Sequence, residues 1–393
     1  MEHEFVIVSA NRTAVGRFGG QLRNVPAADL AATVMKEAIT QAGLTVEQVN
    51  EVVFGEVRQS TEASNLARVA ALKAGIPIES SGYTVNRLCA SGMQSVISGV
   101  QHLAFHSQDI VLAGGAENMS RAPLYLRNSR FGEGNPYIVD SNLENGQQPM
   151  EMYGKDLGMG MTAENVAEKY DISREDQDAF ALESQKRAKQ AWEEGRFDSQ
   201  IVPIEIKSKK ETSVFARDEH MRDTSLEKLA SLKPVFKKDG TVTAGNACGR
   251  NDGASAIILM TAEKANILGL KPLAKVKSWS TTGVDPRYMG IGPVPAIEKL
   301  LKQTDLKVQD IGLWELNEAF ASQSLAVIRQ VGIPISKVNV NGGAIALGHP
   351  LGATGAIILT KLLHEMKHRN EQFGISTLCV GGGQGMAVLL ENM

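Results

Sequence analysis

The hydrophobic residues of this chain follow two spacings, one typical of helices and one typical of strands. Leu30, Val34 and Ala38 recur on one helical face, and Gly43 ends that pattern. Short runs rich in β-branched residues indicate strands between such helical segments. Strands that alternate with helices predict an α/β protein in which helices cover a sheet. The predicted strands are 5–9, 52–57, 83–85, 109–113, 201–206, 254–260, 273–278, 311–316, 338–340, 375–380 and 386–391, and the predicted helices after the first are 65–74, 91–105, 162–170, 174–194, 294–301, 319–331 and 356–368.

A short repeat divides the chain into two similar parts. The sequence Gly-Ile-Pro-Ile occurs at 75–78 and again at 332–335, and a predicted strand ending in Val-Asn follows each copy. A glycine-containing turn and a long helix come next in both places, so we expect two similar α/β halves. The segment 119–161 is rich in Gly, Asn, Met and Pro with little periodicity, and it indicates an insertion. The expected units are 1–118 with 246–272, the inserted loop domain 119–245, and 273–393.

The composition narrows the class of protein. A chain of 393 residues with 43% hydrophobic and 22% charged residues is typical of a globular protein of two or three structural units. A net charge of −3 gives no reason to expect a nucleic-acid partner. The sequence has no apolar segment long enough to cross a bilayer and no recognisable targeting segment, so we expect a cytoplasmic protein without a membrane partner. Three cysteines, Cys89, Cys248 and Cys379, lie far apart, which argues for a reducing compartment.

Cys89 lies between a predicted strand and the predicted helix 91–105. Free N–H groups and the dipole at a helix N-terminus favour a thiolate, the form in which cysteine acts as a nucleophile. An isolated cysteine before a helix can equally be a small core residue. On this segment alone both interpretations stand.

Three segments of the second half carry further candidate chemistry. Asn317 ends a predicted strand, where a helix cap is the simpler interpretation. His349 lies among five glycines and before Pro350, near a helix start that would keep its ring neutral and basic, although a buried histidine bonded to backbone is the alternative. Cys379 precedes a glycine-rich segment that leads into a strand and so fails the dinucleotide-binding pattern. The backbone N–H groups of this glycine-rich segment, beside Cys379, could instead stabilise an oxyanion.

The sequence His-Glu-Met-Lys-His at 364–368 matches a zinc-binding pattern. Leucines mark the buried face of that predicted helix, and both histidines fall on the other face. Since no third ligand follows in the short remaining chain, we expect no metal site.

Four motifs in this order and spacing together resemble those of the thiolase family: 86–92, 317–320, 348–350 and 379–383. The resemblance covers essentially the whole chain. It implies two duplicated βαβαβαββ halves in five α-β-α-β-α layers, with the helix after Cys89 and its counterpart at the centre. It also implies that the inserted loop domain binds coenzyme A and that the protein is a homodimer or a tetramer built from dimers.

The resemblance assigns roles to five residues. Cys89 is expected to attack an acyl-CoA thioester, with His349 as its base and Cys379 as general acid and base for the second substrate. One oxyanion hole would use His349 and a water held by Asn317, and the other the N–H groups of Cys89 and Gly381. A carbanion beside a thioester is too unstable in water without such help, so a base near neutrality and fixed donors must act together.

The resemblance also implies a set of substrate- and CoA-binding residues: Met159, Arg222, Phe236, Ala244, Cys248, Met289, Ala319 and Phe320. Arg222 would lie at the adenine end of CoA, and Met159 and Met289 near a short acyl pocket. Two positions depart from the family. Gly158 stands where a histidine is common, so a polar contact to the pantetheine arm is missing, and Cys248 stands where many members have serine, which is a better hydrogen-bond donor.

The expected activity is that of an acetyl-CoA C-acetyltransferase. It would join two acetyl-CoA into acetoacetyl-CoA and CoA by a ping-pong Claisen condensation, or run the reverse thiolysis, through an acyl-cysteine. No metal and no tightly bound cofactor is expected. The alternatives are a degradative 3-ketoacyl-CoA thiolase of fatty-acid β-oxidation with longer-chain specificity, and a non-catalytic CoA- or lipid-binding protein, against which the intact set Cys89, His349 and Cys379 argues.

Overall fold

The computed structural model describes residues 3–132, 134–207 and 212–393. One sheet path runs through them in the order β13-β14-β15-β12-β1-β11-β5-β3-β4. It consists of two half-sheets, which join where Val6 and Ile7 of β1 pair antiparallel with Lys275 and Ala274 of β12. The first half-sheet contains β1 (Phe5–Thr13), β3 (Glu51–Gly55), β4 (Ser81–Val85), β5 (Val111–Asn118) and β11 (Asn251–Thr261), and the second contains β12 (Ala274–Gly283), β13 (Leu313–Leu316), β14 (Phe373–Val380) and β15 (Gln384–Asn392).

The two half-sheets share one topology. In the first, β3 is parallel to β5, and β5 is antiparallel to β11. In the second, β13 is parallel to β14, and β14 is antiparallel to β15. The duplication expected from the repeated tetrapeptide is therefore confirmed.

The strand predicted at 338–340 is wrong. Val338 makes a single parallel bridge with Trp314, where the first half has the full strand β4. Asn339 adopts a φ of 45°, in the left-handed region, so the chain turns away at once. Its side chain replaces the missing strand pairing, since Nδ2 donates to the Leu316 carbonyl at 2.8 Å and Oδ1 accepts from the Leu316 N–H at 2.9 Å.

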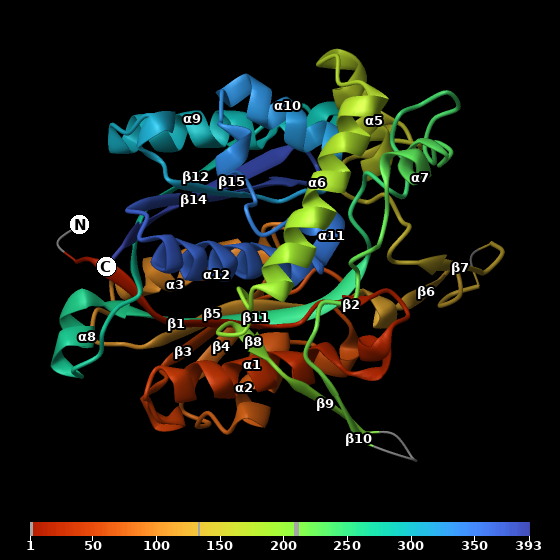
Figure 1. Ribbon diagram of the computed structural model, residues 1–393. Helices are drawn as coiled ribbons and strands as arrows, with labels where there is room; N and C mark the ends of the chain where they lie inside the picture. Colours follow the sequence, from red (N-terminus) through yellow and green to blue (C-terminus); the bar gives the residue numbers. More distant parts are fainter. Residues whose placement is uncertain (1–2, 133, 208–211) are drawn as a thin grey trace.

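Helices and half-sheets stack in five layers (Figure 1). Helices cover the outer face of each half-sheet, and further helices lie between the two half-sheets. The predicted α/β class and α-β-α-β-α architecture are thus confirmed. The outer layer on the first half-sheet consists of α1 (Ala27–Gln41) and α2 (Leu66–Ala74). The central layer consists of α3 (Ser91–Leu103) and α12 (Leu351–Arg369), and the outer layer on the second half-sheet consists of α9 (Pro293–Thr304) and α10 (Ala321–Val331).

The two central helices approach closely at their starts. A Cβ on Gly92 of α3 would lie 2.9 Å from the carbonyl oxygen of Gly352 and 2.9 Å from the backbone nitrogen of Ala356, both in α12. A side chain at Gly92 would therefore push the helices apart. Since Cys89 precedes α3 and His349 precedes α12, this contact brings the two segments side by side.

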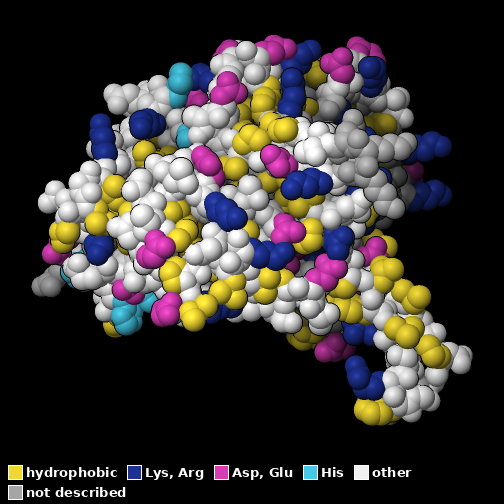
Figure 2. Space-filling model, turned by 90° about the horizontal axis from the view of Figure 1, so that it is seen from below, with side chains coloured by type: hydrophobic (Ala, Val, Ile, Leu, Met, Phe, Trp, Pro, Cys, Tyr) yellow, Lys and Arg dark blue, Asp and Glu magenta, His cyan; other side chains and the backbone are white. Residues whose placement is uncertain are grey.

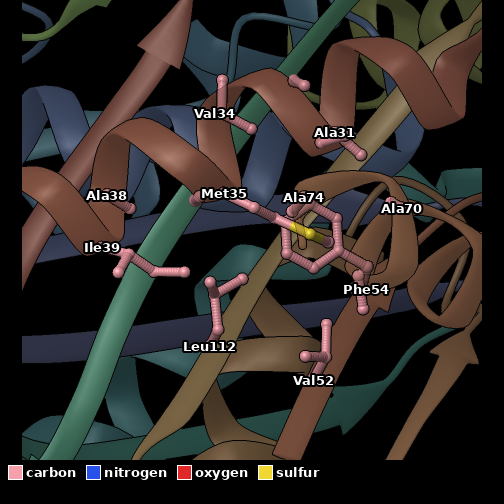
Figure 3. Close-up of a cluster of buried hydrophobic side chains, with 14 of the residues drawn as sticks. Ala31, Val34, Met35, Ala38, Ile39, Val52, Phe54, Ala70, Ala74 and Leu112 are labelled. Atoms are coloured by element: carbon pink, nitrogen blue, oxygen red, sulfur yellow. The ribbon is translucent and has the colours of Figure 1, made fainter. Parts of the chain in front are cut away.

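The core of the first half lies between its outer helices and its sheet (Figure 3). Val34 and Met35 of α1 pack there with Phe54 of β3, and all three are fully buried. The helical face predicted from Leu30, Val34 and Ala38 is confirmed, because each of these side chains is buried. β3 and β5 are buried along their whole length, as expected for strands with helices on both faces.

Between β5 and β11 the chain leaves the sheet. There the hairpin β6–β7 projects from the body (Figure 1), while β8 returns to pair with β1. The region between β5 and β11 holds β6 (Leu124–Arg127), β7 (Tyr137–Asp140), α4 (Met150–Tyr153), α5 (Met159–Lys169), α6 (Arg174–Glu193), β8 (Ile201–Val202), β9 (Ile204–Lys207), β10 (Thr212–Phe215) and α7 (Leu226–Ala230). The remaining elements, outside this region, are β2 (Gly16–Arg17), α8 (Ala262–Ile267) and α11 (Ala344–Leu347).

None of the described helices is long and apolar enough to cross a membrane.

Candidate active site

Cys89 sits in a tight turn between β4 and α3. The preceding Leu88 has a φ of 46°, a strained conformation for a residue with a side chain. Two side chains hold it: Oδ1 of Asn86 accepts from the Leu88 N–H at 2.9 Å, and Oγ of Ser91 donates to the Leu88 carbonyl at 2.7 Å. The Cys89 side chain is only half-buried, so a substrate can reach it.

His349 lies between α11 and α12 and is buried. Its Nδ1 lies 2.6 Å from Oγ1 of Thr354, and that hydroxyl donates to the Pro350 carbonyl at 2.8 Å. The hydroxyl therefore accepts from Nδ1–H, which leaves Nε2 as the basic nitrogen. Burial lowers the pKa of His349 to about 4, so the ring is neutral as expected, although burial and not the helix N-terminus is the cause.

Asn317 follows β13 and is buried beside His349, with Nδ2 3.4 Å from Nε2 of the ring. Its Oδ1 is buried and has no hydrogen-bond partner among the residues that the structure describes. A buried acceptor without a donor is costly, so this oxygen is suited to hold a donor brought in from the cleft.

Three thiols lie close enough for their charges to interact. Burial raises the pKa of Cys248 to about 12 and that of Cys379 well above its usual range, and a charge on Cys89 raises both further. Burial also raises the pKa of Cys89, although the N–H groups of Gly381 and of Cys89 itself and the charge of Arg58 lower it. Loss of solvation outweighs the local donors, so burial opposes the thiolate that the helix start favours at Cys89, and both Cys89 and Cys379 are thiols in the free protein.

One cleft of about 910 Å³ brings the candidate residues together. Asn317 does not itself line the cleft, but it contacts His349, which does. The lining includes four of the five expected catalytic residues and all eight expected binding residues: Cys89, His349, Cys379, Gly381, Met159, Arg222, Phe236, Ala244, Cys248, Met289, Ala319 and Phe320.

The expected binding residues are held by contacts among themselves. The rings of Phe236 and Phe320 pack edge to face, with their centroids 6.3 Å apart. Nη1 of Arg222 donates to the Ala244 carbonyl at 2.9 Å. The Cys248 N–H donates to the Ala319 carbonyl at 3.0 Å. The ring contact ties the inserted segment to the second half, and the Cys248 bond ties the segment that follows the insertion to the same half.

The neighbourhood of Gly158 contains a residue that the sequence did not single out. A Cβ on Gly158 would lie 3.2 Å from Oδ1 of Asn145, which also lines the cleft. No motif marks Asn145, because only the fold brings it to Gly158. The sequence patterns also did not single out Thr354, whose hydroxyl contacts His349. The one signal in the sequence for this residue is its place five residues after His349 in the glycine-rich segment.

The histidines of the zinc-like pattern lie on α12, outside this cleft. His364 contacts the Ala10 carbonyl through Nε2 at 2.9 Å and the Ser199 hydroxyl through Nδ1 at 3.0 Å. Nδ1 of His368 contacts Arg196. Over the described ranges, no cluster of three or more His, Cys, Asp or Glu side chains could hold a metal ion.

Comparison with known proteins agrees over the full length. Residues 5–263 match the thiolase N-terminal domain and residues 270–392 the thiolase C-terminal domain. The chain is 48% identical to the acetyl-CoA acetyltransferase of Syntrophomonas wolfei over 400 aligned residues, covering 100% of both chains. It is 49% identical to the acetyl-CoA acetyltransferase of Cupriavidus necator, covering 99% of both.

Solved structures give the same result. The crystal structure of the Bacillus anthracis acetyl-CoA acetyltransferase superimposes with a TM-score of 0.96 at 46% identity, covering 100% of this chain and 99% of that one. Human mitochondrial 3-ketoacyl-CoA thiolase in complex with CoA superimposes with a TM-score of 0.93 at 44% identity, covering 100% and 98%. The chain therefore belongs to the thiolase family and is an acyltransferase.

Proposed function

We propose that this enzyme is an acetyl-CoA C-acetyltransferase that condenses two acetyl-CoA or cleaves acetoacetyl-CoA with CoA. The observation that carries the proposal is the convergence of Cys89, Cys379 and a neutral His349 on one cleft, beside the N–H of Gly381. The relatives named as acetyl-CoA acetyltransferases, at 48% and 49% identity, support the same choice of substrate.

In the first step, the sulfur of Cys89 attacks the thioester carbonyl while its proton moves to Nε2 of His349. The N–H groups of Cys89 and Gly381, which already lower the pKa of Cys89, stabilise the negative oxygen that forms. The intermediate collapses to an acyl-cysteine, and the departing CoA thiolate takes a proton from Cys379. His349 is now a cation opposite a Cys379 thiolate, which stabilises both charges.

In the second step, the Cys379 thiolate removes the α-proton of another acetyl-CoA, and the resulting carbanion attacks the acyl group. His349 keeps its proton on Nε2 and donates to the enolate oxygen together with a water held by Oδ1 of Asn317. Cys89 leaves as thiolate and recovers its proton from His349. In thiolysis, the raised pKa of Cys379 keeps the thiol ready to protonate the departing carbanion.

The rival activity is that of a degradative 3-ketoacyl-CoA thiolase, and a human mitochondrial 3-ketoacyl-CoA thiolase is among the structural neighbours. Steady-state thiolysis of acetoacetyl-CoA and of 3-oxooctanoyl-CoA separates the two. We expect the higher kcat/KM for acetoacetyl-CoA. Met159 and Met289, which the family resemblance assigns to a short acyl pocket, lie in the wall of the cleft. A higher kcat/KM for the eight-carbon substrate would overturn the assignment.

The proposal extends to the insertion and to assembly. Residues 119–245 would serve as the CoA-binding loop domain of a cytoplasmic enzyme that uses CoA only as substrate and needs no metal. The β6–β7 arm carries exposed apolar side chains, among them Leu124 at 65% and Ile138 at 69% exposure, and hydrophobic groups are prominent on the projecting arm (Figure 2). Such an arm fits contact with a second copy in a homodimer or tetramer. Light scattering that compares the molar mass of a variant of the β6–β7 arm with that of the native chain tests this contact between copies.

A further inference from the structure

The central helix α12 carries a buried lysine that the proposed steps do not use. Lys361 is the only buried lysine among the residues that the structure describes, and lysine is almost never fully buried unless it is paired. Its Nζ donates to Oε2 of Glu315 at 2.9 Å and to the Gly342 carbonyl at 2.7 Å. Lys361 therefore joins three segments of the second half: α12, β13 and the glycine-rich segment before α11.

Two of these segments carry groups of the proposed active site. Glu315 lies on β13, two residues before Asn317. Gly342 begins the segment that leads through α11 to His349. The bonds that Lys361 makes to both segments therefore act on the places of Asn317 and His349 from behind.

One face of α12 contacts both sides of this arrangement. Thr354 lies seven residues before Lys361, which is about two helical turns, so the two side chains share a face. Thr354 contacts Nδ1 of His349 at 2.6 Å, and Lys361 contacts Glu315 at 2.9 Å. The spacing of these two residues on one helix thus sets how far the histidine ring lies from the end of β13.

The contact between Asn317 and His349 does not fix that spacing by itself. Nδ2 of Asn317 lies 3.4 Å from Nε2 of the ring, at the long end of the hydrogen-bond range. Asn317 also borders a cavity of about 20 Å³, roughly the size of one water molecule, which Glu315, Thr354 and Lys361 line as well. A side chain beside such a cavity has room to shift, so its position depends on what holds the surrounding segments.

Neither stability nor charge accounts for the pair of Lys361 and Glu315. A buried ion pair is weak evidence for stability, because apolar residues of similar size often serve as well. The pair does not tune the proposed base either, since burial alone lowers the pKa of His349. Burial raises the pKa of Glu315 and the charge of Lys361 opposes that shift, so loss of the lysine favours a protonated Glu315 that no longer binds α12.

We propose, on the basis of the acetyl-transfer function above, that Lys361 is a positioning residue for the step that forms or consumes the enolate. By binding Glu315 and the Gly342 carbonyl, it holds Asn317 against Nε2 of His349, where the two side chains act together on the enolate oxygen.

Acylation of Cys89 should not depend on Lys361. The oxyanion of that step meets the N–H groups of Cys89 and Gly381, and His349 keeps its own orienting bond to Thr354. The two halves of the reaction should therefore respond differently when the lysine is replaced.

The test compares two reactions of the intact enzyme. Exchange of isotopically labelled CoA into acetyl-CoA needs only acylation and deacylation of Cys89, whereas thiolysis of acetoacetyl-CoA also releases the enolate of acetyl-CoA. We expect Lys361→Met to lower kcat for thiolysis about 10- to 100-fold, because a donor group in the reacting centre is misplaced. The rate of CoA exchange should change by less than about threefold, which a general loss of folded protein would not produce.

A double variant separates position from folding. Lys361→Met combined with Glu315→Met removes both charges and keeps two long side chains, so it should unfold near the native denaturation midpoint. The thiolysis defect should persist in it while exchange stays intact. Lys277→Met is the matched control, because Lys277 pairs with Glu391 at 3.0 Å in the same half, is partly exposed and lines neither cavity, so both rates should stay native.

Equal loss of exchange and thiolysis in Lys361→Met overturns the inference, as does native thiolysis in either variant. Failure of both variants to fold also overturns it, since the pair would then serve the fold alone. All of these results leave the proposed function standing as long as the native enzyme catalyses both reactions. If the native enzyme does not cleave acetoacetyl-CoA, the proposed function fails, and this inference fails with it.

Discussion

The Thr354 hydroxyl lies 2.6 Å from Nδ1 of His349, one turn into the helix that the histidine precedes. Because the same hydroxyl donates to the Pro350 carbonyl at 2.8 Å, it accepts the Nδ1 proton and turns Nε2 toward Asn317. The tautomer of the proposed base therefore depends on one side chain that does not line the cleft.

Thr354→Val keeps the shape of this side chain and removes the acceptor. We expect kcat/KM for acetoacetyl-CoA thiolysis to fall about 10- to 100-fold, as is usual when a histidine loses its orienting partner. Thr354→Ser retains the hydroxyl and should stay near the native rate. Equal rates for the valine and serine variants would show that Thr354 does not position the ring.

The acid limb of the rate profile should reflect a buried histidine. The proposed base is active when neutral, and burial lowers the pKa of His349 to about 4. We expect kcat/KM, which reports the free enzyme, to stay level as the pH falls through 6.5 and to drop only as it approaches 4. A loss of rate centred near the ordinary histidine pKa of about 6.5 would contradict the neutral-base role.

Asn145 should supply a polar contact near Gly158. Because its Oδ1 lies where a side chain at 158 would begin, we expect Asn145→Ala to raise KM for acetyl-CoA about three- to tenfold, the equivalent of one hydrogen bond, with kcat little changed. Asn135→Ala, in an exposed part of the same insertion, is the control. An effect on kcat alone would rule out a substrate contact.

Glu318 ties α6 to the segment that precedes His349. It accepts from the Ser184 hydroxyl at 2.6 Å, Nδ2 of Asn339 at 2.8 Å and the Ile345 N–H at 3.2 Å. Burial raises its pKa, but three donors favour the ionised form. Glu318→Gln would set an amide donor against these donors, so we expect a loss of about 1–3 kcal/mol in the free energy of unfolding, measured by chemical denaturation.

The exposed Glu298 on α9 provides a matched control for that experiment, because Glu298→Gln should leave the denaturation midpoint unchanged. If Glu318→Gln unfolds at the native midpoint as well, the carboxyl is protonated in the folded protein.

Much of the architecture could be predicted from spacing alone. The buried face of α1 and the repeated order of elements follow from local patterns that burial in a layered fold reinforces. The strand at 338–340 could not be corrected in this way, since its apolar residues fit a strand. Only the contact of the Asn339 amide with Leu316 shows that a side chain replaces the ladder.

The motif residues could be named from the sequence, but their protonation states could not. A helix start beside Cys89 indicated a thiolate, whereas burial by the surrounding layers raises the pKa of that thiol. Arg58, Gln147 and Asn145 carry no motif, and the fold alone brings them to the cleft. Solvation and long-range contacts are properties of the packed chain, so local patterns do not contain them.

The central claim is that Cys89 carries the acyl group while Cys379 handles the α-proton. Mass spectrometry of the protein after incubation with acetyl-CoA, followed by peptide mapping, tests it most directly. We predict one acetyl group on Cys89 in the native enzyme and in Cys379→Ala, which still acylates but does not condense, and none in Cys89→Ala. Acetylation of Cys379 in the native enzyme, or equal loss of acylation in the two variants, would contradict the account.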